Sequence, residues 1–205
     1  MKPRFDATCQ SPPTIEIVRL YVSREHNYFG HHGQSPGQEP AVEVASVECA
    51  AGRGLRGDRF FDYREDYKGQ ITFFAWEVYE DLCRQLKIHD KHTGVLRRNA
   101  ITRGIDLNTL VGRRFSVQDT QFEGMGECSP CYWMNMAFGP GAEDALRGRG
   151  GLRARILTNG ILRANMPRWS GCITVAELRR YRDVTLQLQG IKYSAGSVKL
   201  ILPPR

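Results

Sequence analysis

Apolar and polar residues alternate along several short stretches of the chain, which is the pattern of half-buried β-strands. The alternation is clearest at residues 14–22 and 41–49, where β-branched side chains are frequent. Shorter stretches of the same kind occupy residues 70–74, 97–102, 114–117, 152–158 and 161–163. Asn159-Gly160 lies between the last two stretches and predicts a tight hairpin there.

Residues 75–86 have the spacing of a helix instead, because their apolar side chains recur on one helical face. Glycines are frequent at 27–38 and 51–58, which are predicted loops. Many short strands with one or two short helices predict a mainly β fold, a barrel or a sandwich. The main domain is expected at 14–165. Residues 166–205 contain one helical and two strand-like pieces, and we expect them to form an accessory segment packed on that domain.

The length of 205 residues suits one domain with a short appendage. Hydrophobic residues make up 41% of the chain, which excludes disorder throughout. No apolar run approaches the roughly 18 residues that cross a bilayer. The N-terminus lacks the apolar core of a secretory signal, so we expect a cytoplasmic protein with no membrane partner. Its six cysteines are then expected to be free thiols.

The formal net charge of +7 is unevenly spread along the chain. Between residues 145 and 182 the only acidic residue is Glu177, and this window holds nine arginines, at 147, 149, 153, 155, 163, 168, 179, 180 and 182. Such a cluster favours binding of phosphate, on a nucleic acid or on a small cofactor. The alternative is a solvated surface with poor charge balance.

Cys128-Ser129-Pro130-Cys131 has the CxxC spacing, which occurs in several kinds of site. Structural zinc needs a second pair of ligands, and no such pair stands at the required spacing. A thioredoxin-like redox pair needs a βαβ frame, whereas the surroundings are rich in strands. Two other interpretations are favoured over these: a single functional thiolate on a turn that binds a soft metal or carries sulfur, and two buried structural cysteines.

Four motifs follow one another along the chain. They are Gly54-Leu55-Arg56-Gly57-Asp58-Arg59, Arg97-Arg98-Asn99 with the later Gly104-Ile105-Asp106-Leu107-Asn108, Ser129-Pro130-Cys131, and Gly148-Arg149-Gly150-Gly151-Leu152-Arg153. In combination they resemble the MOSC domain family, named after the C-terminal part of molybdenum cofactor sulfurases. The likeness spans residues 14–163 and is closest to stand-alone bacterial members of the family.

The resemblance implies a β-barrel-like fold and a molybdenum cofactor, a pterin dithiolene that carries molybdenum and a phosphate. It also brings a family-level association with pyridoxal phosphate binding. The second cysteine of the motif can ligate molybdenum in the family, which points here to Cys131 as catalytic thiolate and metal ligand. Family contacts to the pterin or its phosphate fall on Arg97 and Asn99, with a surface charge and a strand-end turn residue as the respective alternatives. Arg59 is a further candidate for an anion contact, with an ion pair to Asp58 or Asp62 as the alternative, and Ser129 is a candidate hydrogen-bond donor to a cofactor oxygen.

Strand periodicity adds further cofactor-binding candidates. Lys68, Gln70 and Thr72 alternate along one predicted strand and share a face, which either lines the cofactor cleft or faces solvent. Arg153 and Arg155 share a face of the stretch at 152–158 in the same way, and they either guide the cofactor phosphate or form a plain exposed surface.

The leading hypothesis is a molybdenum-dependent oxidoreductase that reduces the N–O bond of small N-hydroxylated compounds. Such a reduction consumes protons, and His31 in the glycine loop is the candidate donor, with an ordinary surface loop as the alternative. A separate electron-donating redox protein or reductase is required, because no flavin, haem or iron–sulfur motif is present. The alternative function is a sulfur carrier with a persulfide on Cys131. A nucleic-acid module is disfavoured, because Trp169 and Tyr181 alone supply aromatic rings among the later arginines.

Overall fold

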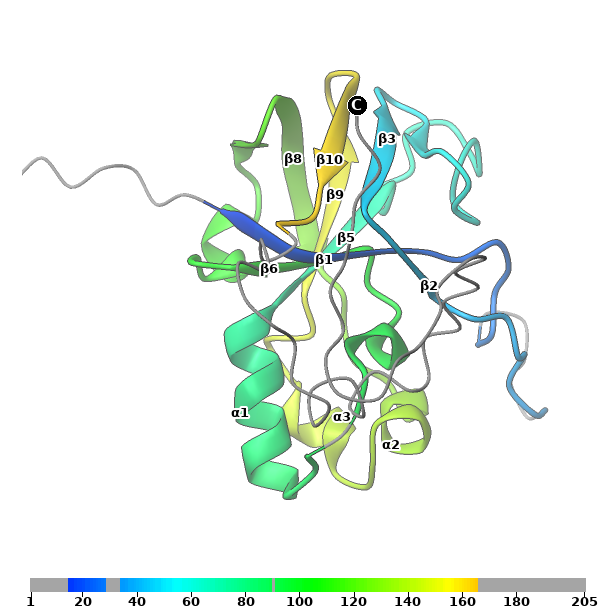
Figure 1. The fold of residues 1–205 in the computed structure, drawn as a ribbon, viewed down its shortest axis with the longest axis vertical. Coiled ribbons are helices and arrows are strands. Elements are labelled where there is room, and N and C mark those ends of the chain that lie inside the picture. The colour runs from blue at the N-terminus through cyan, green and yellow to red at the C-terminus, as the bar shows by residue number, and fades with distance from the viewer. Residues whose placement is uncertain (1–14, 29–33, 90, 166–205) are drawn as a thin grey trace, which may run out of the picture. The chain divides into compact units, whose positions relative to one another are not determined.

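The computed structural model describes residues 15–28, 34–89 and 91–165, and the predicted accessory segment at 166–205 lies outside that part (Figure 1). The strands are β1 (Glu16–Val22), β2 (Val42–Val44), β3 (Ser46–Ala50), β4 (Gly54–Leu55), β5 (Ile71–Ala75), β6 (Ala100–Arg103), β7 (Arg114–Val117), β8 (Thr120–Glu127), β9 (Leu152–Ile156) and β10 (Gly160–Arg163). The helices are α1 (Trp76–Leu86), α2 (Trp133–Ala137) and α3 (Ala142–Ala145), with 3₁₀ turns η1 (Thr93–Leu96) and η2 (Leu107–Leu110).

Two sheets carry the fold. The larger has the strand order β2-β1-β6-β5-β9-β8-β7, and the smaller has the order β10-β3-β4. Within the larger sheet β5 and β6 run parallel and the other pairs run antiparallel. The prediction of a mainly β fold with few short helices is therefore confirmed. The pairing of the described strands leaves both sheets open rather than closing them into a barrel.

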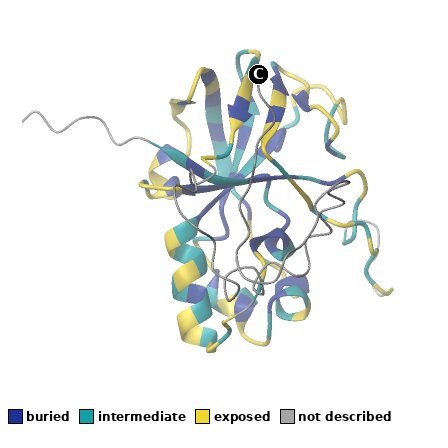
Figure 2. Cartoon of the chain, viewed as in Figure 1, coloured by how far each residue is buried: buried dark blue, intermediate teal, exposed yellow. Residues whose placement is uncertain are grey.

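The central strand β5 separates two hydrophobic clusters. Phe73 packs with Phe122 of β8 in the cluster that joins the two sheets. Phe74 points to the opposite face and packs with Leu82 of α1 and with Phe138, because successive side chains of a strand alternate between faces. Both faces of β5 are thus covered, and buried residues line the centre of the molecule in Figure 2. The helices lie together beside the sheets, below the strands in the view of Figure 1.

The predicted hairpin at Asn159-Gly160 is wrong. The flanking strands form, but β9 pairs with β5 and β8 of the larger sheet, whereas β10 pairs with β3 of the smaller one. The side chain of Asn159 instead accepts a hydrogen bond from the backbone N–H of Ala51 at 2.8 Å. The predicted strand at 41–49 is likewise divided, because β2 joins the larger sheet and β3 the smaller. Both differences arise where the chain passes from one sheet to the other.

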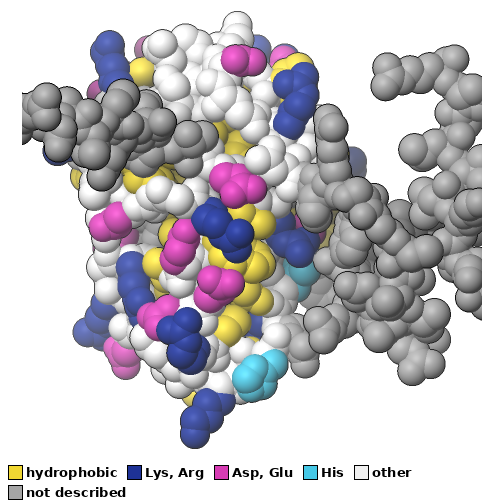
Figure 3. Space-filling model, turned by 60° about the vertical axis from the view of Figure 1, so that its left-hand side comes forward, with side chains coloured by type: hydrophobic (Ala, Val, Ile, Leu, Met, Phe, Trp, Pro, Cys, Tyr) yellow, Lys and Arg dark blue, Asp and Glu magenta, His cyan; other side chains and the backbone are white. Residues whose placement is uncertain are grey.

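The arginines that follow residue 145 do not form one uniform basic patch. Arg147 pairs with Asp144 at 2.9 Å and Arg149 with Asp81 at 2.5 Å, and the guanidinium of Arg155 lies 3.8 Å from a carboxylate oxygen of Asp66. The arginines at 168, 179, 180 and 182 lie outside the described residues. On the face turned toward the viewer in Figure 3, acidic and basic side chains surround a small hydrophobic area.

Among the helices of the described ranges, none combines the length and the apolar composition that a membrane-spanning segment requires.

Candidate functional site

Asp58, in the loop after β4, is the centre of a buried hydrogen-bond network. One carboxylate oxygen accepts from the backbone N–H of Ser23 at 3.2 Å and from the side-chain amide of Asn99 at 3.0 Å. The other oxygen accepts from the backbone N–H of Phe60 at 3.1 Å. Arg59 forms an ion pair with the same carboxylate at 3.5 Å. Asp58 therefore ties the glycine-rich loop to the end of β1 and the start of β6.

Arg97 is the second buried charge of the site. Its guanidinium donates to the backbone carbonyls of Glu39 and Glu25, each at 2.8 Å, and to the hydroxyl of Ser23 at 2.6 Å. None of these acceptors is a carboxylate. Burial and the nearby charge of Arg59 lower the pKa of Arg97 to about 10. The sequence placed Arg97 at a surface or at the cofactor; the structure buries it at the end of η1.

Arg98 was named in the motif without a role, and the structure gives it one. Its guanidinium donates to the carbonyl of Cys128 at 3.1 Å and to that of Gly150 at 3.0 Å. A third bond reaches the carbonyl of Leu96 at 3.0 Å. Arg98 therefore holds the start of the CxxC turn against the chain segment that leads into β9.

Within the described residues, Arg59 alone of these three arginines forms an ion pair. It contacts Asp58, whereas Arg97 and Arg98 donate to carbonyl and hydroxyl oxygens, and the carboxylates within electrostatic range of Arg97 are those of Asp58 and Glu39. Burial lowers the pKa of Arg59, and burial together with Arg59 and Arg97 lowers the pKa of His26 beside them. Buried positive charge with so little compensation favours an anionic ligand. The donor set therefore fits the phosphate of the cofactor that the motifs imply.

Asn99 and Thr72, two predicted cofactor contacts, bind each other. The side-chain oxygen of Asn99 accepts from the backbone N–H and the hydroxyl of Thr72, at 3.0 and 2.8 Å. Its amide nitrogen donates to Asp58 and to the carbonyl of Tyr21. Because protein groups occupy both ends of the amide, the structure shows Asn99 as a link between β1, β5 and β6. A contact from it to the cofactor stays a prediction.

The two cysteines of the CxxC turn differ in environment. Cys128 is buried and only 4% exposed, whereas Cys131 is an exposed free thiol. The reading of two buried structural cysteines is therefore wrong for Cys131. No group of three or more histidine, cysteine or carboxylate side chains gathers as a metal site within the described ranges. A thiolate of Cys131 is thus available as a single soft ligand. Ser129 is exposed on the same turn.

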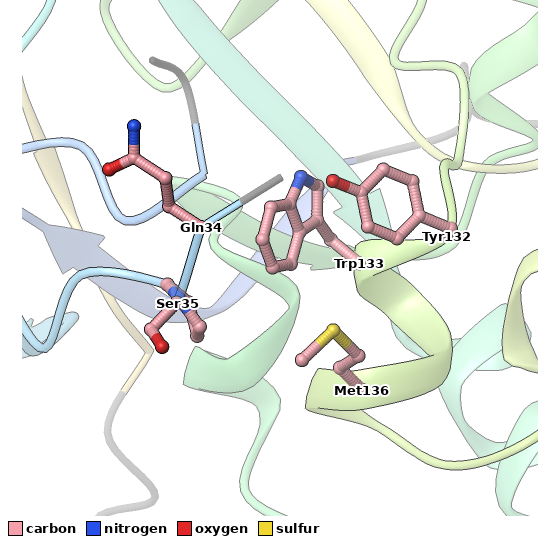
Figure 4. Close-up of a pocket in the computed structure, with 6 residues that line it drawn as sticks. Gln34, Ser35, Tyr132, Trp133 and Met136 are labelled. Atoms are coloured by element: carbon pink, nitrogen blue, oxygen red, sulfur yellow. The ribbon is translucent and has the colours of Figure 1, made fainter. Parts of the chain in front are cut away.

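An aromatic stack stands next to Cys131. Trp133 of α2 stacks with Tyr132 at a ring-centroid distance of 4.6 Å and with Tyr28 at 4.9 Å. Burial raises the pKa of Tyr28, the charge of Arg97 lowers it and that of Cys131 raises it, which brings Tyr28 within electrostatic range of both. An open pocket of about 550 Å³ lies along Tyr132 and Trp133 (Figure 4). The residues that directly follow Cys131 in the chain therefore line a pocket, and Tyr28 links the electrostatic environment of Cys131 to that of Arg97.

The candidates near β5 separate in the structure. β5 begins at Ile71, so Lys68 lies in an exposed turn before the strand rather than on it. Gln70 is 2% exposed, and its amide bridges the carbonyl of Gly52 and the backbone N–H of Ile156, at 2.8 Å each. The prediction that Lys68 and Gln70 share a strand face with Thr72 is therefore wrong, because the strand starts later than its apolar pattern suggests.

Arg153 of β9 lies opposite Thr72 of β5 in the antiparallel pairing of these two strands. Its charge lowers the pKa of Tyr67, which burial raises, and Tyr67 is also within electrostatic range of Cys128. The described contacts include no hydrogen bond or ion pair from the guanidinium of Arg153 to another residue. It therefore retains its hydrogen-bonding capacity for a ligand.

Gly151 is required where the chain turns from the CxxC segment into β9. Its φ is +105°, and a Cβ there would lie 2.3 Å from the carbonyl oxygen of Phe73. We expect Gly151→Ala to lower the free energy of unfolding by about 3 kcal/mol, through strain and overpacking together. Gly148→Ala is the matched control, because its φ is +74° with open space around the Cβ, and we expect about 1 kcal/mol. Urea unfolding of both variants measures the difference, and equal losses would contradict the steric explanation.

The predicted proton donor His31 lies outside the described residues. Sequence reasoning missed Asp58 as the centre of the network, Arg98 as the clamp on Cys128, and His26 beside the arginines. Asp58 stood inside a recognised motif, so its position was a usable signal. Nothing local distinguished His26, because its neighbours Arg59 and Arg97 come from distant parts of the chain.

Comparisons with known proteins agree with this geometry. The family model of the MOSC domain matches residues 27–167. Among solved structures, the YuaD protein from Bacillus subtilis has a TM-score of 0.58 at 16% identity, over 73% of this chain and 91% of its own. YiiM from Geobacillus stearothermophilus has a TM-score of 0.54 at 14% identity, over 80% of this chain and 81% of its own.

YiiM from Escherichia coli has a TM-score of 0.53 at 18% identity, over 80% of this chain and 75% of its own. A search of the curated proteins gives no match. At these identities the solved structures show a shared fold, while the family model covers well over half of the 205 residues. The chain therefore belongs to the MOSC domain family.

Proposed function

We propose that the protein binds a molybdenum cofactor and reduces the N–O bond of small N-hydroxylated compounds. The MOSC family is associated with this cofactor, and the site supports the assignment through one observation. The exposed thiol of Cys131 lies on the turn that Arg98 holds through the carbonyl of Cys128, and Tyr28 is within electrostatic range of both Cys131 and Arg97. A sulfur carrier would need the thiol alone, whereas the arginines suit a ligand that is also anionic.

Each part of the site has a task in this proposal. Cys131 supplies a thiolate to the metal, and the guanidiniums of Arg59, Arg97 and Arg153 hold the phosphate and orient the cofactor. Asp58 and Asn99 fix the arginine loop and β6 in place. The bound cofactor supplies the two-electron redox chemistry. Reduction of an N-hydroxylated compound also takes up protons and releases water, so a separate redox protein or reductase must deliver the electrons.

The test is to express the protein in cells that make molybdenum cofactor and to measure metal content and turnover. We expect about one molybdenum per chain, as one thiolate ligand implies. We also expect reduction of N-hydroxylated compounds when a chemically reduced dye donates the electrons. Protein that gains no molybdenum in such cells, and reduces none of these compounds, would overturn the proposal.

Reversing the charge of Arg153 should weaken cofactor retention without harming the fold. Arg153 has no hydrogen-bond partner among the residues that the structure describes, so Arg153→Glu leaves none of those residues unpaired, while a charged hydrogen bond to the phosphate is lost. We expect molybdenum content after dialysis to fall roughly tenfold. Arg114→Glu on the exposed edge strand β7 is the control, and its metal content should stay at the wild-type level. Equal losses in both variants would show a general effect of charge instead of a contact at Arg153.

A further inference from the structure

The pocket beside Cys131 has an unusual wall. Tyr132 is 41% exposed and Met136 is 60% exposed, although large apolar side chains are usually buried. They stand four residues apart at the start and on the body of α2, so they lie on one side of that helix. Both line the open pocket of about 550 Å³, a volume within the range of roughly 300–1,000 Å³ for small-molecule sites.

Stacking on Trp133 fixes the side of the pocket that Tyr132 forms. Trp133, which also lines the pocket, is only 3% exposed and is stacked with both Tyr28 and Tyr132. The backbone N–H of Met134 donates to the carbonyl of Cys131 at 2.8 Å, so the first turn of α2 fixes the wall relative to the thiol. The pocket therefore opens at the side of Cys131 with its aromatic surface already arranged.

The opposite wall is polar. Gln34, Ser35 and Pro36 line the side of the pocket that lies across from Trp133 and Met136, and the amide of Gln34 extends away from Trp133 in Figure 4. That amide ends a flexible side chain, and rotation can turn it toward the edge of a planar ligand whose faces contact rings and a thioether. Phosphate binding is not favoured here, because the lining residues that the structure describes carry no positive charge.

We propose that this pocket, lined by Tyr132, Trp133 and Met136 against Gln34 and Ser35, binds a planar aromatic ring that bears a polar substituent. The inference rests on the proposed function in one respect: the ring would be the body of the substrate, with its N–O group directed toward Cys131. Tyr132 and Met136 would then set the preference of the enzyme for flat aromatic compounds over saturated ones.

A binding experiment tests the pocket without the cofactor or turnover. Benzamide and cyclohexanecarboxamide carry the same amide on six-membered rings, one flat and one puckered. Titration of each into the full-length protein, followed by calorimetry or by chemical shifts, gives the two dissociation constants. We expect benzamide to bind roughly three- to tenfold more tightly, because only a flat ring stacks on the aromatic wall.

Variants of the aromatic wall test whether its side chains cause the preference for benzamide. Tyr132→Ala and Met136→Ala should each remove most of the difference between the two amides. Ile161→Ala on β10, a site with 43% exposure, should keep the difference unchanged. Equal binding of the two amides by the wild-type protein, or an unchanged preference in both wall variants, would overturn this inference. Neither result would contradict the molybdenum proposal. A protein that gains no molybdenum but still prefers benzamide would contradict the molybdenum proposal and support the pocket proposal.

Discussion

Replacing Cys131 with serine is expected to abolish molybdenum retention while the protein stays folded. The thiol is exposed on a turn, so its removal costs little packing. A serine hydroxyl is a hard, weakly acidic ligand, and soft metal centres select thiolate over it. Elemental analysis of both proteins, purified in parallel from cells that make the cofactor, should show molybdenum falling to background in the variant. Thermal unfolding should occur within a few degrees of the wild type.

Cys128→Ser is the matched control for this experiment. The two cysteines belong to one turn, but Cys128 is 4% exposed and its backbone is held by Arg98 and by Gly151. We expect Cys128→Ser to retain molybdenum and to lose about 1–2 kcal/mol of stability, because a hydroxyl replaces a buried thiol. The opposite pattern, with metal lost only from Cys128→Ser, would show that Cys128 is the ligand and would contradict the prediction for Cys131.

A third outcome would favour the alternative function. Wild-type protein that carries no molybdenum but reacts in a persulfide assay at Cys131 would indicate a sulfur carrier. In that case the arginines would still need an anionic ligand other than the cofactor. Arg59 has one ion pair and Arg97 donates to a carbonyl, whether or not Cys131 carries a persulfide.

Local patterns predicted the elements better than their partners. The helix α1 and the strands β1, β5 and β6 form close to their predicted positions, because each depends on a short run of side chains. The hairpin at Asn159-Gly160 failed, because pairing with β3 rather than β9 is a choice between distant strands. Asn159-Gly160 indicates a turn but not the sheet that the strand after the turn joins.

The longest strand was missed for a related reason. β8 contains Gly124 and Gly126, which lower strand propensity and weaken the alternating pattern. The structure explains the first of them, because a Cβ at Gly124 would lie 2.1 Å from the carbonyl oxygen of Leu110. The close approach of the two backbones thus requires glycine at position 124, and this glycine also weakens the sequence pattern that would predict the strand.

The site divides in the same way. The exposed turn at Cys131 could be predicted from the Ser-Pro motif, since a turn is local. The partners of Asn99 could not, because they come from Tyr21, Asp58 and Thr72, which are far away in sequence. The motifs contain Asp58 and Asn99, whereas the hydrogen bond between their side chains could be found only from the folded structure.

Asp58→Ala is expected to be the most destabilising single substitution in the described site. The carboxylate accepts hydrogen bonds from Ser23, Phe60 and Asn99 and balances the charge of Arg59. Without it, a nearly buried guanidinium keeps its charge among other arginines and has no counter-ion, and breaking such a pair costs about 3–5 kcal/mol. Urea unfolding at neutral pH should therefore show a large fall in the transition midpoint.

The neighbouring pair of Asp62 with Arg53 provides the control. It joins the same residue types a few positions away, but its side chains are 47% and 53% exposed. We expect Asp62→Ala to leave the transition midpoint close to that of the wild type, because water solvates the arginine that is left. Asp58→Asn keeps the shape and removes the charge, so a loss close to that of Asp58→Ala assigns the effect to charge. If Asp58→Ala and Asp62→Ala unfold at the same urea concentration, Asp58 does not hold the arginine site together, and the positions of Arg59 and Arg97 must depend on the surrounding backbone instead.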